Sequence, residues 1–160
     1  MIAIRTTSPD DEPAILRIAS SEPLFDHDDV ACVRELLTDY LLRPDHSDYF
    51  FLSAEDAGQL VGFVCYGPTP LTIGTFDLYW ICVDRGSARQ GIGRALIERV
   101  EQEVRQARGR LIVVETSGLD SYAPTRAFYQ SLGYQRAAEV PEFYGPGDSL
   151  VIYTRRLGEG

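Results

Sequence analysis

Apolar residues follow two different periods along this chain, and together they predict a mixture of strands and helices. Short apolar or alternating segments bounded by turn residues are typical of strands. They occupy residues 2–5, 49–54, 60–66, 72–83, 111–115, 135–140 and 150–157. Apolar residues at helical spacing occupy residues 9–19, 28–42, 91–107 and 124–132. The resulting order, β-α-α-β-β-β-α-β-α-β-β, contains no repeat or linker and predicts one domain of the α+β class over residues 1–160.

Turn residues predict where several of these elements begin and end. Ser8 precedes Pro9 and is placed to cap the first helix. Gly109 and Gly133 are placed to end the helices before them, since glycine adopts the left-handed conformation that is common at a helix C-terminus. Residues 141–148 contain two prolines and two glycines, and they predict a long loop between the last two strands.

The segment Ser-Ala-Arg-Gln-Gly-Ile-Gly-Arg-Ala-Leu, residues 87–96, lies between a predicted strand and a predicted helix. The first amides of a helix lack internal partners and carry partial positive charge, so this junction is suited to an anion such as a pyrophosphate. Gly91 and Gly93 let an anion approach the backbone, and Arg89 and Arg94 add positive charge. A tight turn without a ligand accounts for the two glycines equally well.

Two familiar phosphate-binding motifs do not fit this segment. The dinucleotide-binding motif requires a third glycine, but Leu96 stands at that place. The nucleoside-triphosphate loop requires Gly-Lys followed by Ser or Thr, and the chain has no such triplet. A phosphate-binding scaffold for another nucleotide is therefore disfavoured as the function of this segment.

The segment resembles the acetyl-coenzyme A signature of the GNAT acyltransferases, Arg/Gln-x-x-Gly-x-Gly/Ala at a strand-to-helix junction. The resemblance continues in residues 80–83 and in Phe128-Tyr129-x-x-x-Gly133-Tyr134, and it covers roughly residues 73–136. One position departs from the family, since Ala88 replaces the usual first Arg or Gln. The resemblance implies the GNAT acyl-CoA N-acyltransferase fold. That fold is a three-layer α/β/α arrangement with a mixed, mostly antiparallel sheet of about seven strands and about four helices.

This resemblance also implies an acetyl-CoA-dependent N-acetyltransferase that acts on a primary amine of a small molecule, protein or peptide. The amine attacks the thioester directly in a ternary complex. Main-chain groups near residues 81–83 are expected to bind the acetyl carbonyl and the pantetheine arm. The cofactor-binding residues that the family pattern implies are Ile81, Cys82, Val83, Ala88, Arg89, Gln90, Gly91, Ile92, Gly93, Arg94, Pro124 and Phe128. A non-catalytic acyl-CoA-binding or regulatory module is the alternative.

Acyl transfer to an amine needs a group that takes the proton of the amine and a group that protonates the leaving thiolate. Tyr129 matches the position of the family's acid tyrosine, although it also fits a tyrosine packed in a helix. Asp77 matches the position of the glutamate base in the histone-modifying branch. Glu115 is its rival and Glu142 a weaker one, and a chain of water molecules would need neither.

Strand periodicity and aromatic residues give two further expectations about the site. Alternation from residue 75 to residue 83 predicts one shared face for Asp77, Tyr79, Ile81 and Val83. The acceptor pocket is expected to be lined by Phe25, Tyr66, Trp80 and Tyr144, although aromatics at such spacing also fit a core. The first helical pair lies beside the acceptor in the family and adds His27 and Tyr40. An exposed turn for His27 and a core position for Tyr40 are the favoured alternatives.

Composition excludes several classes of partner. The net charge of −9 argues against nucleic acid and leaves cationic partners such as amines open. No apolar run approaches the roughly 20 residues that cross a bilayer, and the N-terminus does not resemble a signal peptide. We expect a cytoplasmic protein in which Cys32, Cys65 and Cys82 are buried, reduced thiols rather than a disulfide or metal site. A homodimer that pairs the late strands, as in many relatives, stays open.

Overall fold

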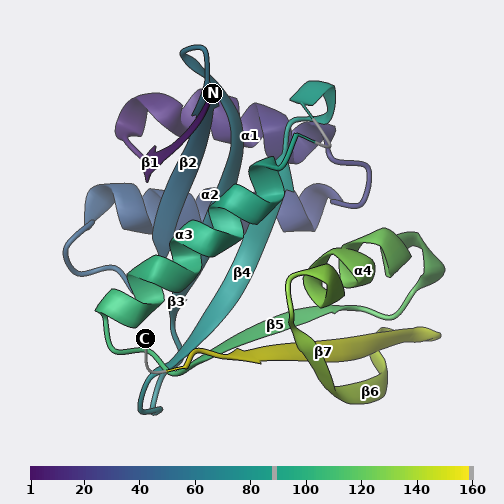
Figure 1. The fold of residues 1–160 in the computed structure, drawn as a ribbon. Helices are drawn as coiled ribbons and strands as arrows, with labels where there is room; N and C mark the ends of the chain where they lie inside the picture. Colours follow the sequence, from purple (N-terminus) through teal and green to yellow (C-terminus); the bar gives the residue numbers. More distant parts are fainter. Residues whose placement is uncertain (88–89, 159–160) are drawn as a thin grey trace.

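The computed structural model describes residues 1–87 and 90–158. They form a seven-stranded sheet in the order β1-β2-β3-β4-β5-β7-β6 (Figure 1). Only β4 and β5 pair in parallel, so the predicted mixed, mostly antiparallel sheet is confirmed. The strands are β1 (Ile2–Thr6), β2 (Phe50–Asp56), β3 (Gln59–Pro68), β4 (Thr75–Val83), β5 (Leu111–Ser117), β6 (Gln135–Gly145) and β7 (Asp148–Arg156).

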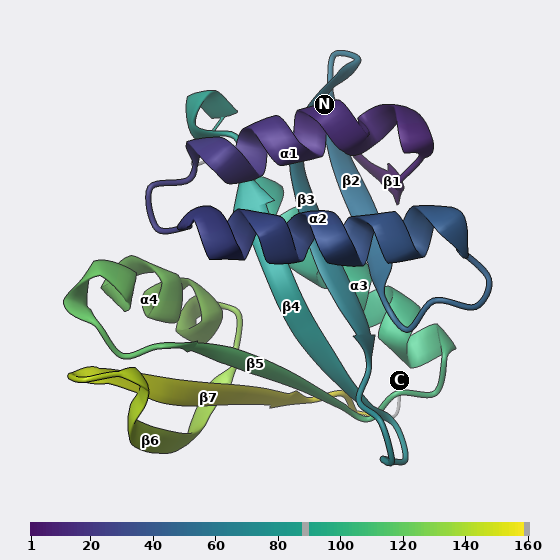
Figure 2. The same cartoon turned by 180° about the vertical axis from the view of Figure 1, so that it is seen from behind.

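Helices cover both faces of the sheet and give the predicted three layers. The first pair, α1 (Glu12–Ser21) and α2 (His27–Leu42), lies on one face (Figure 2). The second pair, α3 (Ile92–Gln106) and α4 (Ala123–Ser131), lies on the other (Figure 1). Short 3₁₀ turns η1, η2 and η3 occupy Pro9–Asp11, Arg85–Ser87 and Asp120–Tyr122. None of the helices in the described residues is long and apolar enough to cross a membrane.

The apolar core is divided by the sheet into two clusters. On the α3–α4 face, Ile92, Leu96, Val100 and Val104 recur every fourth residue of α3 and are each at most 1% exposed. This spacing puts them on one side of the helix, as the sequence predicts. On the opposite face, residues of α1 and α2 pack against β2 and β3, around the stacked rings of Phe51 and Phe63.

The last two strands form a longer hairpin than the sequence predicts. Residues 141–145 belong to β6 and only a tight turn separates β6 from β7, so the prediction of a loop over 141–148 is wrong. Pro141 is tolerated because β6 is the edge strand, where a missing amide donor costs no ladder bond. The pairing is irregular between Val140 and Gly145, and Glu142 has a positive φ of 56° there.

The predicted helix ends are correct at one glycine and wrong at the other. Gly133 has φ 90° just after α4, as expected. After α3 the left-handed residue is Arg108, with φ 63°, and not Gly109. The Gly109 amide donates to the Val104 carbonyl, and a Cβ on Gly109 would lie 2.2 Å from Val104 Cγ1. Gly109 is therefore required by close packing. Ser8 and Pro9 begin η1, which leads into α1.

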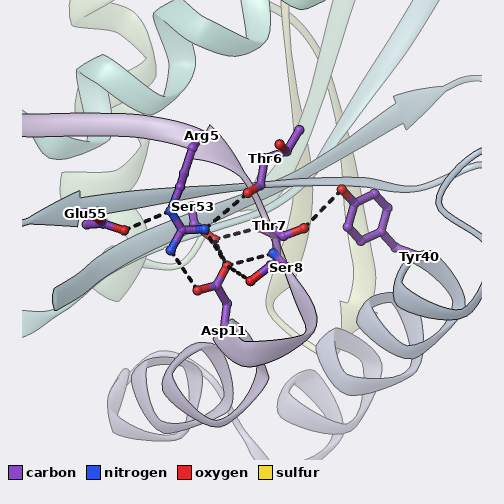
Figure 3. Close-up of polar contacts among 8 residues, drawn as sticks. All are labelled: Arg5, Thr6, Thr7, Ser8, Asp11, Tyr40, Ser53 and Glu55. Atoms are coloured by element: carbon purple, nitrogen blue, oxygen red, sulfur yellow. Dashed lines mark hydrogen bonds and ion pairs between the residues drawn. The ribbon is translucent and has the colours of Figure 1, made fainter. Parts of the chain in front are cut away.

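A buried polar network fixes the start of α1 against the first strands (Figure 3). Arg5 donates two hydrogen bonds to the Asp11 carboxylate, at 2.7 and 2.9 Å. Ser53 also donates to Asp11, and the Ser53 and Thr7 hydroxyls share a hydrogen bond of 2.7 Å. The Tyr40 hydroxyl, which lies in the core, donates to the Thr7 carbonyl at 3.4 Å. The network satisfies the buried polar groups where β1 turns into the helical layer.

Candidate active site

The site opens where two neighbouring strands separate. β4 and β5 pair over only four residue pairs, which end at Leu78 and Val114. Beyond these residues β4 pairs with β3 and β5 pairs with β7, and the two strands diverge (Figure 1). A cleft of about 1040 Å³ lies at this divergence. Its walls come from the α1–α2 turn, β4, β5, the start of α4 and the β6–β7 hairpin.

A bulge in β4 changes which side chains face the acceptor side of the sheet. Leu78 and Trp80 pair with neighbouring residues of β3, so Tyr79 is an extra residue in the ladder. Asp77 and Tyr79 face the α1–α2 layer, whereas Ile81 and Val83 pack with the α3–α4 cluster. The predicted common face for these four residues is wrong, because the bulge reverses the alternation after Tyr79.

Asp77 lies in the cleft with one carboxylate oxygen fixed. Its Oδ2 accepts hydrogen bonds from the Thr69 hydroxyl at 2.7 Å and from the Tyr79 hydroxyl at 3.4 Å. Burial raises the pKa of Tyr79, and the charge of Asp77 raises it further, so this hydroxyl stays a donor at neutral pH. In the described part of the chain no hydrogen bond engages Oδ1, which leaves that oxygen able to accept a proton.

Glu115 lies on the same side of the sheet as Asp77. Val113 pairs with Asp77 across the parallel strands, and Glu115 follows it by two residues on β5. Glu115 is exposed and lines the cleft. Burial raises the pKa of Tyr144 to about 12, and the charges of Glu115 and Asp148 contribute to the increase. Glu142, the weaker rival, lies on β6 and does not line the cleft.

Tyr129 reaches the cleft from the opposite side of the sheet. It is 3% exposed and its ring packs against Phe128, Tyr134 and Tyr153, with centroids 5.4, 5.8 and 6.3 Å away. Its hydroxyl makes no hydrogen bond to any described residue, and the side chain lines the cleft. Burial raises its pKa, so the hydroxyl keeps its proton at neutral pH.

Three of the four predicted acceptor residues lie together. Phe25 and Trp80 meet edge to face with ring centroids 5.2 Å apart, and Tyr144 lines the same cleft. Tyr66 is buried in the core against Phe50 and does not line it. The His27 side chain is 98% exposed, as the favoured alternative predicts, although His27 is the first residue of α2 and not part of a turn.

The predicted phosphate cradle lies at the N-terminus of α3. Gly91 caps the helix with φ 77°, and a Cβ built there would meet no atom of the described residues within 4 Å. No described residue therefore fills the space beside Gly91. A Cβ on Gly93 would lie 3.1 Å from the Phe128 ring and 4.0 Å from Val83, so this glycine lets α3 approach α4 and β4. Open space and a bare helix N-terminus fit an anionic pyrophosphate.

The remaining predicted cofactor residues are divided between this cradle and the core. Gln90 and Arg94 are exposed at the helix start, where Arg94 lies 3.8 Å from Glu98. Ile92 is buried in the α3 core, and Pro124 is exposed in the first turn of α4. The Cys82 side chain packs toward α1, which leaves only its main chain for a cofactor. Ala88 and Arg89 lie outside the described residues.

The structure adds residues that the sequence analysis missed. The Tyr122 hydroxyl donates to the Leu24 carbonyl at 3.0 Å and so joins η3 to the α1–α2 turn across the cleft. The Ser117 hydroxyl donates to Asp148 and holds β7 beside β5. Leu24 and Tyr122 are 98 residues apart, and no local pattern links them. Tyr79 could have been found, because it follows Asp77 at strand spacing.

Comparison with known proteins identifies the family. A family model described as an acetyltransferase (GNAT) domain matches residues 47–136, more than half of the chain. Blasticidin-S acetyltransferase of Streptomyces morookaense is 39% identical over 103 residues, which are 64% of this chain and 68% of that protein. A GNAT-family crystal structure from Desulfovibrio desulfuricans is 38% identical with a TM-score of 0.94, and the alignment covers 98% of this chain and 99% of that one.

The chain therefore belongs to the GNAT acetyltransferase family, and it is an N-acetyltransferase by that membership. GNAT enzymes use acetyl-CoA as the acetyl donor. A protein from Salmonella typhimurium whose structure contains its cofactor acetyl-CoA has the same fold, with 20% identity and a TM-score of 0.77. That alignment covers 100% of this chain and 96% of the other. The resemblance noted in the sequence and the predicted fold are both confirmed.

Proposed function

We propose that this protein transfers the acetyl group of acetyl-CoA to a primary amine by direct attack in a ternary complex. The observation that carries the proposal is the cleft at the divergence of β4 and β5. It brings Tyr129 from the α4 side and Asp77 from the α1–α2 side to one opening. A donor and an acceptor that enter from opposite sides of a sheet can meet only at such a gap.

The N-terminus of α3 and the edge of β4 are the parts of this chain that would hold acetyl-CoA. The first amides of α3, beside Gly91, offer donors and partial positive charge to the pyrophosphate, and Arg94 adds a full charge at the rim. Main-chain groups of residues 81–83 face the gap, since no described strand pairs with that edge of β4 beyond Leu78. When bound, acetyl-CoA supplies an acyl group activated as a thioester.

Tyr129 and Asp77 divide the proton transfers between them. The Tyr129 hydroxyl is protonated at neutral pH and has no described partner, so it can donate its proton to a leaving thiolate. Asp77 Oδ1 can take the proton of the attacking amine, while Thr69 holds Oδ2 in place. Glu115, on the same sheet face, is the competing base.

Initial-rate kinetics test this proposal. Release of coenzyme A is measured while acetyl-CoA and an amine, such as butylamine, are varied together. A ternary complex predicts double-reciprocal lines that intersect, and parallel lines would indicate an acetylated enzyme. Binding of acetyl-CoA without release of coenzyme A in the presence of any amine would support a non-catalytic module instead.

A further inference from the structure

The walls of the cleft carry a concentration of negative charge. Asp77 is only one of the carboxylates that line it. The other six are Glu22, Asp26, Asp28, Asp29, Glu115 and Asp148. The chain contains no lysine, and among the described residues no arginine or histidine lines the cleft. A cleft with low-dielectric walls and charges of one sign focuses its field on whatever enters.

Asp28 lies 3.9 Å from the exposed His27 imidazole, and among the described residues no basic side chain forms an ion pair with the other six carboxylates. Asp26 and Asp29 accept from each other's backbone amides, at 2.8 and 2.9 Å, and Asp148 accepts from the Ser117 hydroxyl. Arg126 is close, but it donates to the carbonyl oxygens of Ser117 and Leu119. These hydrogen bonds position Asp26, Asp29 and Asp148 and leave their charge uncompensated.

Asp29, in the first turn of α2, lines the cleft and acts on tyrosines of its other walls. Burial raises the pKa of Tyr122, and the charges of Asp29 and Asp148 raise it further. Asp29 also contributes to the raised pKa of Tyr144 on the β6–β7 hairpin. Asp29 is half-buried, and burial raises its own pKa, to which the charges of Asp26 and Asp28 add. The charge of Asp29 therefore acts on both η3 and the β6–β7 hairpin, on other walls of the cleft.

A metal ion does not account for this arrangement. In residues 1–87 and 90–158, no group of three or more His, Cys, Asp or Glu side chains is placed to hold a metal. The Tyr129 side chain is 3% exposed, and its hydroxyl, which has no described hydrogen-bond partner, opens onto the same cleft and points to a ligand there. The carboxylates therefore bear on the identity of the acceptor.

The amine that attacks the thioester must be neutral. This requirement limits which cationic acceptors suit the acidic cleft. Surrounding carboxylates stabilise an ammonium ion, so they raise the pKa of the amine and oppose its deprotonation. A monoamine loses its attraction to the cleft at the moment of reaction. A second charge elsewhere on the acceptor keeps the attraction while the first amine reacts.

We propose that the acceptor is a small molecule that carries at least one positive charge besides the amine that is acetylated, and that Asp29 binds this second charge. The inference rests on the proposed function, because it names the acceptor class of the same cleft. The Tyr122–Leu24 contact across the cleft limits its width and favours a small, flexible polycation over a folded protein.

The test compares butylamine with 1,4-diaminobutane, which share a four-carbon chain and differ by one charge. We expect kcat/KM for the diamine to exceed that for butylamine by about tenfold at low salt, since both charges act in a region of reduced dielectric. Salt of about 0.5 M should reduce the ratio severalfold, because it screens partly exposed charges. Equal kcat/KM for the two amines would overturn the inference.

The Asp29→Asn variant keeps an oxygen for the Asp26 amide and removes the charge. We expect the diamine-to-butylamine ratio to fall by about three- to tenfold, mainly through KM for the diamine. Asp45→Asn removes an exposed charge outside the cleft and should leave the ratio unchanged. An unchanged ratio in Asp29→Asn would contradict the assignment.

Calorimetry separates failure of the inference from failure of the proposed function. The diamine and butylamine are titrated into the intact protein without acetyl-CoA, so the measurement does not depend on turnover. Tighter binding of the diamine that weakens in Asp29→Asn supports the inference even if coenzyme A is never released. Transfer to butylamine without preference for the diamine would retain the enzyme and reject the second charge.

Discussion

Replacing Tyr129 with phenylalanine separates a catalytic hydroxyl from a structural one. The ring is 3% exposed and packs against three other aromatic rings, and phenylalanine preserves those contacts. The lost hydroxyl has no described hydrogen-bond partner. The hydroxyl opens onto the cleft, and its removal breaks no described hydrogen bond, so the fold should not be destabilised.

We therefore expect Tyr129→Phe to lower activity without lowering stability. We expect kcat to fall by about 100-fold, which is the usual contribution of one positioned acid. The free energy of unfolding should be unchanged or higher by up to about 1 kcal/mol, a Tm increase of roughly 2–4 °C at most. Acetyl-CoA affinity should stay within about twofold, since the hydroxyl is assigned to the reaction and not to binding.

Tyr134→Phe is the matched control. Its ring is also 3% exposed, but its hydroxyl donates to the buried Glu101 carboxylate at 3.4 Å. This variant should lose about 1 kcal/mol of stability and keep its kcat. The two variants are compared by urea unfolding and by coenzyme A release at saturating substrates. A Tyr129→Phe variant with normal kcat, or with the stability loss expected of Tyr134→Phe, would refute the assignment.

Three further predictions follow from the site and the fold. Asp77→Asn keeps an acceptor for Thr69 and should lower kcat by about 100-fold. If kcat falls in Glu115→Gln and not in Asp77→Asn, Glu115 is the general base. Burial opposes ionisation of Asp11, but hydrogen bonds from Arg5 and Ser8 outweigh it and hold the pKa of Asp11 below its usual value. This contribution to stability is present above about pH 4 and is lost as the pH falls further, so Asp11→Asn should flatten acid unfolding followed by circular dichroism. Leu96→Ala, in the α3 core, should cost about 2–5 kcal/mol in urea unfolding.

The sequence predicts the elements well because their causes are local. The four-residue spacing of apolar residues in α3 reflects burial of one helix face. The run of β-branched residues in β5 reflects burial of a central strand. Both strands of the β6–β7 hairpin are predicted, but its full length is missed because the prolines and glycines of residues 141–148 are typical of a loop. Only the position of β6 at the sheet edge makes Pro141 acceptable.

The site is predicted less completely because it depends on distant contacts. The glycines of the cradle and Tyr129 stand in a recognisable motif, whereas the facing of Asp77 depends on a bulge that pairing with β3 reveals. The negative charge of the cleft cannot be predicted from the sequence alone. Its carboxylates come from the α1–α2 turn, α2, β4, β5 and β7, which only the fold brings together.

Calorimetric binding of acetyl-CoA tests the central claim most directly. We predict micromolar affinity, about −8 kcal/mol, for the unmodified protein and loss of binding in Gly91→Glu, which places a negative charge at the anion cradle. Gly58→Glu is the matched control. Gly58 has φ 79° against 77° for Gly91, and at neither glycine would a Cβ meet a described residue within 4 Å, so the two variants share the same backbone strain. Retained binding in Gly58→Glu with loss in Gly91→Glu would establish the cradle, and no binding by the unmodified protein, or equal binding by both variants, would contradict it.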